Sequence, residues 1–202
     1  MQRDNILHQY LKIMTRLFIL SVFTCSIFVS FGQTKIDTLN LKFPDKPKLS
    51  IKFQKAIKEQ TSEYDRLFFR DSATTKHYSA TFILDKIDND SNYLPHIFLS
   101  EYWIAFHYKE IIPELIKRVT NKKEVGLTNS ADLIIWERVQ AKQMRFYGHG
   151  GISNDDLFTI AGRANRLLTE ITGENFGRVS MHSTAEQLAT LQKKWIKWLD
   201  KL

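Results

Sequence analysis

SNDDLFTIAGRANRLLTEITGENFG, residues Ser153–Gly177, contains in one stretch the signals of a capped and terminated α-helix. Ser153 or Asn154 can accept hydrogen bonds from the first backbone amides, and the two aspartates that follow suit the positive end of a helix dipole. The sequence predicts a helix over 155–171, which the glycines of TGENFG then interrupt. Gly162 costs about 1 kcal/mol relative to alanine inside this helix, which predicts a close helix crossing there.

The same helical pattern extends on both sides of this stretch. Apolar residues recur at three- and four-residue steps, as on the buried face of a helix. Pro95 suits the first turn of one helix and Pro113 is expected to begin the next, so that the two form an antiparallel hairpin. Trp103 and Trp136 lie on apolar stripes and are assigned to the core. Besides the two proline helices, the second at 111–119, helices are predicted at 49–68, 78–87, 131–146, 155–171 and 184–202.

These elements predict an all-α protein with one structural domain. After an extended leader at 34–47, residues 48–202 are expected to form about six to seven helices, packed as irregular antiparallel hairpins or a compact bundle. The net charge of +7 is spread along the chain rather than gathered in a block. We therefore expect no nucleic-acid partner.

The N-terminal segment has the features of a secretory signal peptide. LFILSVFTCSIFVSF, Leu17–Phe31, is an uncharged run that follows basic residues. It is shorter than the roughly 18 residues of a membrane span, and the small residues Ser30 and Gly32 suit a cleavage site after Gly32. We assign 1–33 to a signal peptide and expect a periplasmic or secreted protein.

Two other interpretations of this segment stay open, a lipoprotein and an uncleaved anchor. Cys25, the only cysteine, lies in the middle of the apolar run rather than at its end, which argues against lipidation. Either Met1 or Met14 can be the true start. Without 1–33 the chain has no cysteine, which excludes disulfides and thiolate chemistry in the mature protein.

YGHGGISNDD, residues 147–156, is the strongest candidate for chemistry. An imidazole is a common general acid or base, so His149 is a candidate for that role; Tyr147 can orient it, and Asp155 and Asp156 can pair with it or hold a cation. A hydrolase centred on these four residues is therefore one hypothesis. The simpler interpretation is a hairpin loop, because its glycines let the chain leave one helix and its polar residues begin the next.

Other catalytic and cofactor motifs are absent from the sequence. HGG resembles an esterase oxyanion loop, but the mature chain has no G-x-S-x-G elbow. No H-E-x-x-H pair and no glycine-rich phosphate loop is present, and the acids around Asp88 lack the remaining ligands of a calcium loop. We therefore predict no metal and no cofactor.

The last helix, 184–202, has an apolar face with Trp195 and Trp198 and an opposite face of lysines. Docking on the core is the simplest use of this pattern. Contact with a partner or with an anionic membrane surface is the alternative. Arg163 and Arg166 can form an anion-binding pair, or they can lie on a solvated face beside acidic residues.

YKEIIPELIKRVTN, residues 108–121, resembles the second helix of a HEAT-type repeat, with its isoleucine–proline pair and closing asparagine. RANRLLTEITGENFG followed by LQKKWIKWLDKL is similar to the tail of bacterial HEAT-repeat proteins, where a tryptophan-bearing helix caps the stack. The resemblance covers about Leu94–Leu202 and shows no repeat period. It implies an irregular α-α superhelix that binds partners through an open helical face, without catalysis.

The leading hypothesis is an exported, non-catalytic helical domain that binds another protein. It predicts an exposed groove lined by aromatic side chains and no cluster of titratable groups with shifted pKa values. The hydrolase hypothesis instead predicts that the four residues of the glycine loop meet in one pocket. The membrane hypothesis predicts that the two tryptophans of the last helix are exposed side by side.

Overall fold

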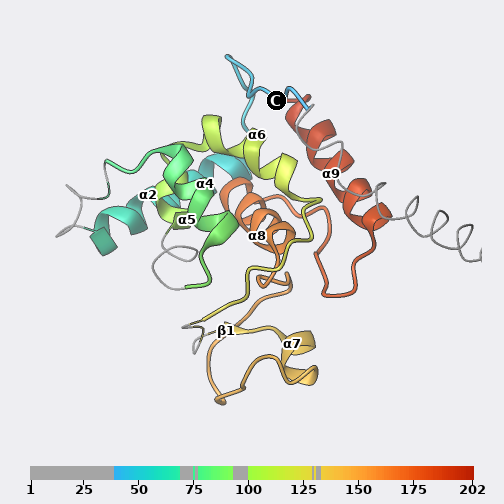
Figure 1. Ribbon diagram of the computed structural model, residues 1–202. Coiled ribbons are helices and arrows are strands. Elements are labelled where there is room, and N and C mark those ends of the chain that lie inside the picture. The colour runs from blue at the N-terminus through green and yellow to red at the C-terminus, as the bar shows by residue number, and fades with distance from the viewer. Residues whose placement is uncertain (1–38, 69–74, 76, 93–99, 129, 131–132) are drawn as a thin grey trace, which may run out of the picture. The chain divides into compact units, whose positions relative to one another are not determined.

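Helices make up most of the structure. The computed structural model describes residues 39–68, 75, 77–92, 100–128, 130 and 133–202, and the predicted signal peptide lies outside them. An all-α fold of about seven helices is confirmed (Figure 1). The elements are α2 Ile51–Phe68, α4 Ala80–Asn89, α5 Ser100–Ile104, α6 Tyr108–Arg118, α7 Trp136–Gln140, α8 Ile160–Thr172 and α9 Ala185–Leu199, with the parallel strands β1 Leu133–Ile134 and β2 Gly151–Ile152.

α8 is the helix around which the others pack. Thr159 caps its start by accepting a hydrogen bond from the amide of Gly162 at 3.1 Å, and Gly173 ends it with a left-handed φ of 68°. α2, α4, α5 and α6 all contact it, so that nearly every side of α8 is covered. Its buried polar residues Arg163 and Asn165 must therefore find their partners inside the protein.

α9 docks on the helical core, as the apolar face of the last helix predicts. The Thr184 hydroxyl accepts from the amide of Gln187 at 3.2 Å, and the Gln187 side chain accepts from the Thr184 amide at 2.8 Å, which forms a capping box. The indole N–H of Trp195 donates to Asn165 of α8 at 2.9 Å. The buried residues of α9 are Leu188, Leu191, Trp195 and Leu199.

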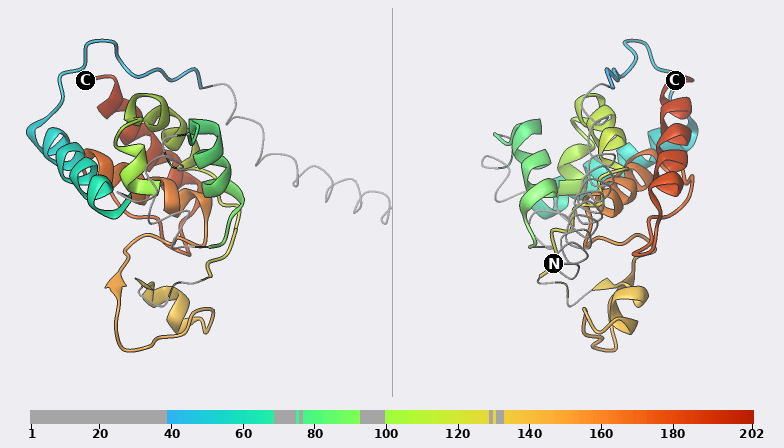
Figure 2. Two further views of the ribbon diagram at one scale, coloured as in Figure 1. Left: turned by 90° about the vertical axis from the view of Figure 1, so that its left-hand side faces the viewer. Right: turned by 45° about the vertical axis from the view of Figure 1, so that its right-hand side comes forward.

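Residues 133–152 leave the helical core and form a separate excursion, which we call the α7 lobe (Figure 2). In it Leu133 pairs with Gly151 and Ile134 with Ile152. A small hydrophobic cluster, made of Leu133, Ile135, Leu157 and the partly buried Leu127, Met144 and Phe158, connects the lobe to the segments that flank it. The lobe is therefore packed by its own residues and by those next to it rather than by the main core.

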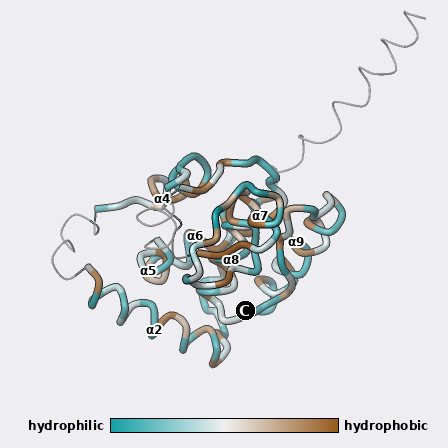
Figure 3. Tube along the Cα trace, turned by 90° about the horizontal axis from the view of Figure 1, so that it is seen from below, coloured by the Kyte–Doolittle hydropathy of each residue, from teal (hydrophilic) through white to brown (hydrophobic). Residues whose placement is uncertain are grey.

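The main core takes buried residues from every described helix except α7. Figure 3 shows that α2 alternates between hydrophobic and hydrophilic residues, as a half-covered helix does. Leu41, Phe43 and Leu49, which belong to no helix or strand, pack against this core. None of the described helices is long and apolar enough to cross a membrane.

The predicted helix at 131–146 is wrong. The described part of this range holds β1 and the five-residue α7, followed by turns. Leu133, Ile134 and Ile135 are consecutive and all buried, which an extended segment beside β2 permits. A helix covered on one face would turn one of the three toward solvent.

Two predicted helix starts are also displaced. α8 begins at Ile160 rather than at 155, because its N-cap is Thr159 and not Ser153 or Asn154. α6 begins at Tyr108, three residues before the predicted start, so that Pro113 lies inside the helix. Pro113 therefore removes one backbone hydrogen bond from the ladder of α6 instead of starting it.

Candidate functional site

The four residues of the predicted catalytic loop lie in two different environments. Tyr147 and His149 are exposed on the α7 lobe. Asp155 and Asp156, which follow the lobe, are buried, and only 1% of Asp156 is exposed. The structure therefore separates the exposed Tyr147 and His149 from the buried Asp155 and Asp156, instead of placing these four side chains together in one pocket.

Asp155 is bound by residues of the helical core. Its Oδ1 accepts from the amide of Val179 at 2.7 Å and from Nδ2 of Asn165 at 2.9 Å. The indole of Trp195 completes this chain through Asn165. Burial raises the pKa of Asp155 to about 6, although the hydrogen bonds from Val179 and Asn165 act in the opposite direction. These contacts give Asp155 the role of joining α8 and α9 to the loop between them.

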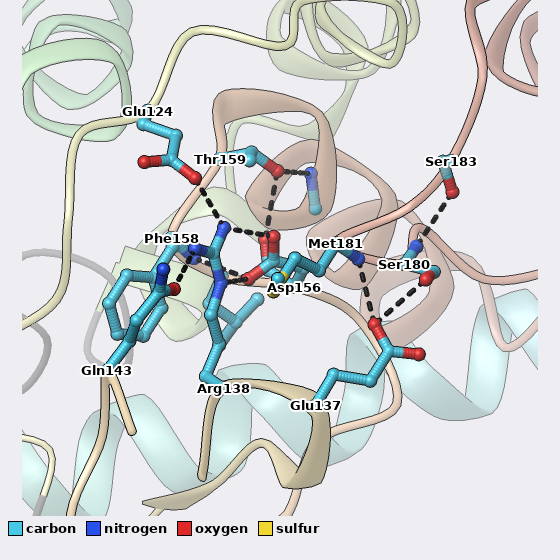
Figure 4. Close-up of polar contacts among 12 residues, drawn as sticks. Glu124, Glu137, Arg138, Gln143, Asp156, Phe158, Thr159, Ser180, Met181 and Ser183 are labelled. Carbon is cyan, nitrogen blue, oxygen red and sulfur yellow. Dashed lines mark hydrogen bonds and ion pairs between the residues drawn. The ribbon is translucent and has the colours of Figure 1, made fainter. Parts of the chain in front are cut away.

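Asp156 forms a buried ion pair with Arg138 of α7 (Figure 4). Nε of Arg138 donates to Oδ1 at 2.8 Å and Nη2 donates to Oδ2 at 2.6 Å. The guanidinium also donates to Glu124 at 2.7 Å and to Gln143, and it lies 4.5 Å from the ring centroid of Phe158. Because Arg138 is only 2% exposed, this bidentate pair fixes α7 to the loop that precedes α8.

Glu137 attaches α7 at a second point. Its carboxylate accepts from the Ser180 hydroxyl and from the Met181 amide, both at 2.8 Å (Figure 4). The guanidinium of Arg178 lies 3.8 Å away. Burial would raise the pKa of Glu137, but the hydrogen bonds from Ser180 and Met181 outweigh it and keep the pKa below its ordinary value. Two adjacent residues of α7 thus hold the lobe to two separate segments.

The α7 lobe exposes a concentration of large apolar side chains. Seven large hydrophobic residues are exposed in the described part of the chain, and four of them lie in this lobe, so that their distribution is not even. We call these four, Trp136, Phe146, Tyr147 and Ile152, the apolar surface. The ring centroids of Trp136 and Phe146 are 5.1 Å apart. The assignment of Trp136 to the core is wrong, since 43% of it is exposed.

The two tryptophans predicted as binding residues do not form a surface. Trp195 is completely buried and Trp198 is half-buried. The Trp198 ring packs against Phe53 at a centroid distance of 5.8 Å and against Trp195 at 5.6 Å. The surface of two exposed tryptophans, on which membrane contact through 184–202 was predicted, is therefore absent from α9.

The predicted anion-binding pair of arginines is also not present. Arg163 is completely buried, and burial lowers its pKa to about 10. Arg166 lies 3.7 Å from Glu170 on the next turn of α8, as a helix-face pair does. The guanidinium of Arg163 instead donates, at 2.7 to 2.9 Å, to the backbone carbonyls of Ile87, Asp90, Gly126 and Leu157.

Glu101 of α5 is a buried carboxyl that sequence reasoning missed. Only 7% of it is exposed, and burial raises its pKa to about 7, against the opposing charge of Arg166. Glu101 and Asp155 are two buried acids with raised pKa values, and no hydrogen bond between them is found among the described residues. In the parts of the chain that the structure describes, no group of three or more histidines, cysteines or carboxylates could hold a metal ion.

Comparisons with protein-family models, with curated proteins and with solved structures find no match. The sequence did contain a signal for the apolar surface. Phe146 and Tyr147 are adjacent aromatic residues in a glycine-rich stretch, 141–154, whose charged residues are Lys142 and Arg145. The surface was missed because the helix predicted over 131–146 assigned Trp136 to a buried face.

Proposed function

We propose that the protein is an exported, non-catalytic helical domain that binds another protein through the apolar surface. The observation that carries this proposal is the exposure of four large apolar residues, between 43% and 61%, within the α7 lobe. Aromatic side chains dominate the energetics of protein interfaces because each buries a large area and loses few rotamers. A partner that covers this surface would remove that apolar area from water.

The attachment of the α7 lobe supports the proposal. Arg138 and Glu137 hold α7 through buried or partly buried hydrogen bonds to Asp156 and Ser180. Trp136 directly precedes these two anchoring residues in α7. A surface that is already ordered before binding loses less conformational entropy when a partner docks.

Export and the HEAT-like relationship belong to the same proposal and depend on the sequence. The apolar run Leu17–Phe31 supports a signal peptide. Pro113 in α6 and the tryptophans of α9 are the residues on which the HEAT-like resemblance is based. Both agree with a helical scaffold that works by binding.

The test is site-specific photo-crosslinking of the full chain in the cells that produce it. A photoreactive phenylalanine analogue at Tyr147 is expected to capture one protein partner, and the capture is expected to disappear in a Trp136→Ala/Phe146→Ala background. The matched control places the analogue at Phe106, which is 50% exposed outside the lobe. If Tyr147 captures nothing, or captures the same proteins as Phe106, the apolar surface is not the binding site.

A further inference from the structure

We infer that β2 accepts an extended, acidic segment of the partner protein as a third strand beside it. This inference rests on the proposed function, because it specifies the chemistry of the partner that covers the apolar surface. Three features of the α7 lobe lead to it: an open strand edge, an apolar side chain at that edge, and two exposed basic residues for which no ion pair is found among the described residues.

The open edge follows from the hydrogen bonds of β2. The amide of Ser153 donates to the carbonyl of Ile134 at 2.9 Å, which directs Ser153 toward β1. Successive residues of a strand direct their backbone groups to opposite edges, so the N–H and C=O of Ile152 face away from β1. Among the described residues, no backbone hydrogen bond outside the β1–β2 pair involves Ile152. One donor and one acceptor are therefore available to an added strand.

The side chains at this edge favour an apolar contact. Ile152 is 61% exposed although its strand partner, Ile134, is 7% exposed. Gly151 precedes it and has no side chain to keep a second backbone at a distance. The contacting rings of Trp136 and Phe146 belong to the same lobe. A segment with alternating apolar residues could pair with β2 and place its apolar side chains on this surface.

The charged residues of the lobe indicate the sign of the charge that the partner segment should carry. Lys142 and Arg145 are exposed, and residues 141–154 contain no aspartate or glutamate. Three acids that the structure describes beside the lobe are already engaged: Glu137 by Ser180 and Met181, and both Asp156 and Glu124 by Arg138. An approaching segment therefore meets uncompensated positive charge, which favours glutamate or aspartate between its apolar residues.

The experiment measures binding of labelled synthetic peptides of about ten residues to the full chain by fluorescence anisotropy. One probe alternates valine with glutamate, a second alternates valine with lysine, and a third is the glutamate peptide with alternate backbone amides methylated. We expect the glutamate peptide to bind at least tenfold more tightly than the other two. Lys142→Glu/Arg145→Glu should reverse the charge preference, and the control Lys193→Glu/Lys197→Glu, with the same charge change on α9, should not.

Several results would overturn the inference. Equal binding of the methylated peptide would exclude strand pairing, and equal binding of the lysine peptide would exclude recognition of acidic charge. Binding of phosphatidylglycerol vesicles that depends on Lys142 and Arg145, without peptide binding, would assign the surface to a membrane instead. Failure of all the peptides together with successful crosslinking at Tyr147 would reject this inference and leave the proposed protein binding intact.

Discussion

Gly162 lies so close to the backbone of Asp156 that a Cβ at Gly162 would be 2.0 Å from the Asp156 carbonyl oxygen. The sequence predicted a close helix crossing at this glycine, but the neighbour is the loop that precedes the same helix. The contact lets the chain turn tightly between the buried pair of Asp156 with Arg138 and the first turn of α8. Position 162 therefore requires glycine because a side chain would overlap the Asp156 backbone, and not because its φ angle is positive.

Replacing Gly162 by alanine should therefore destabilise the protein. Alanine favours a helix by about 1 kcal/mol over glycine, but the overlap is with a backbone atom and cannot be relieved by a side-chain rotation. We expect a net loss of about 1–3 kcal/mol in the free energy of unfolding, measured by urea denaturation. Lys58→Ala on the exposed face of α2 is the control for helix propensity. A Gly162→Ala protein as stable as the parent would contradict the contact.

The buried ion pair predicts a large cost for removing one partner. Asp156→Ala leaves the guanidinium of Arg138 buried without its bidentate carboxylate, so we expect a loss of about 3–5 kcal/mol in unfolding free energy. Removing both charges with Arg138→Met/Asp156→Leu should recover part of that loss. Glu59→Ala breaks the exposed pair with Lys55 and should have no measurable effect. Equal effects of the Asp156 and Glu59 changes would show that the pair is not desolvated.

Because the pKa of Glu101 is raised, we expect the free energy of unfolding to fall as pH rises. Its pKa is about 7 in the folded protein against an ordinary 4.5, so the folded state holds a proton between these values that the unfolded state has released. At 1.36 kcal/mol per pKa unit, this carboxyl costs about 3 kcal/mol above pH 7. Asp155, with its pKa raised to about 6, acts in the same direction at lower pH.

The measurement is the unfolding free energy of Glu101→Gln and of the parent at pH 5 and pH 8. The variant should be more stable than the parent at pH 8 and similar at pH 5, because glutamine has no charge to bury. Glu110→Gln, at an exposed position of α6, should change neither value. A parent protein whose stability does not fall between the two pH values would count against burial of Glu101.

Because the Trp195 indole donates a buried hydrogen bond, we expect replacement of Trp195 to destabilise the protein more than replacement of Trp198. Trp195→Phe keeps an aromatic ring but leaves Oδ1 of the buried Asn165 without its donor, so we expect a loss of about 1–3 kcal/mol. Trp198→Phe at a half-buried position should cost less. Thermal denaturation of the two variants compares them directly, and a larger effect at Trp198 would contradict the assigned hydrogen bond.

Helical periodicity was sufficient to predict the fold class and the helices that pack on one face. The apolar steps of α2 and α9 matched their observed helices closely. Periodicity failed at 131–146, where consecutive apolar residues are buried in an extended segment. Pairing of Ile134 with Ile152 depends on a contact between segments distant in sequence, which local patterns do not contain.

The polar residues were the least predictable part of the site. Asp155 and Asp156 are typical of residues at a helix start. In the structure, Asp155 instead binds the amide of Val179, and Asp156 binds Arg138. Arg163 likewise has the sequence context of a solvated helix face. Whether such residues are buried is decided by the packing of the whole chain, because a buried charge is stable only where its partners converge.

The four carbonyls bound by Arg163 should give the C-terminal end of α4 and two loop segments the same resistance to opening as the central helix. Ile87, Asp90, Gly126 and Leu157 come from three regions of the chain, and a single guanidinium joins them all to α8. None of these regions can open without leaving donors or carbonyls unsatisfied in the interior. In native-state hydrogen exchange, the protected amides around Gly126 should therefore exchange together with those of α8, as one cooperative unit rather than as a fraying loop.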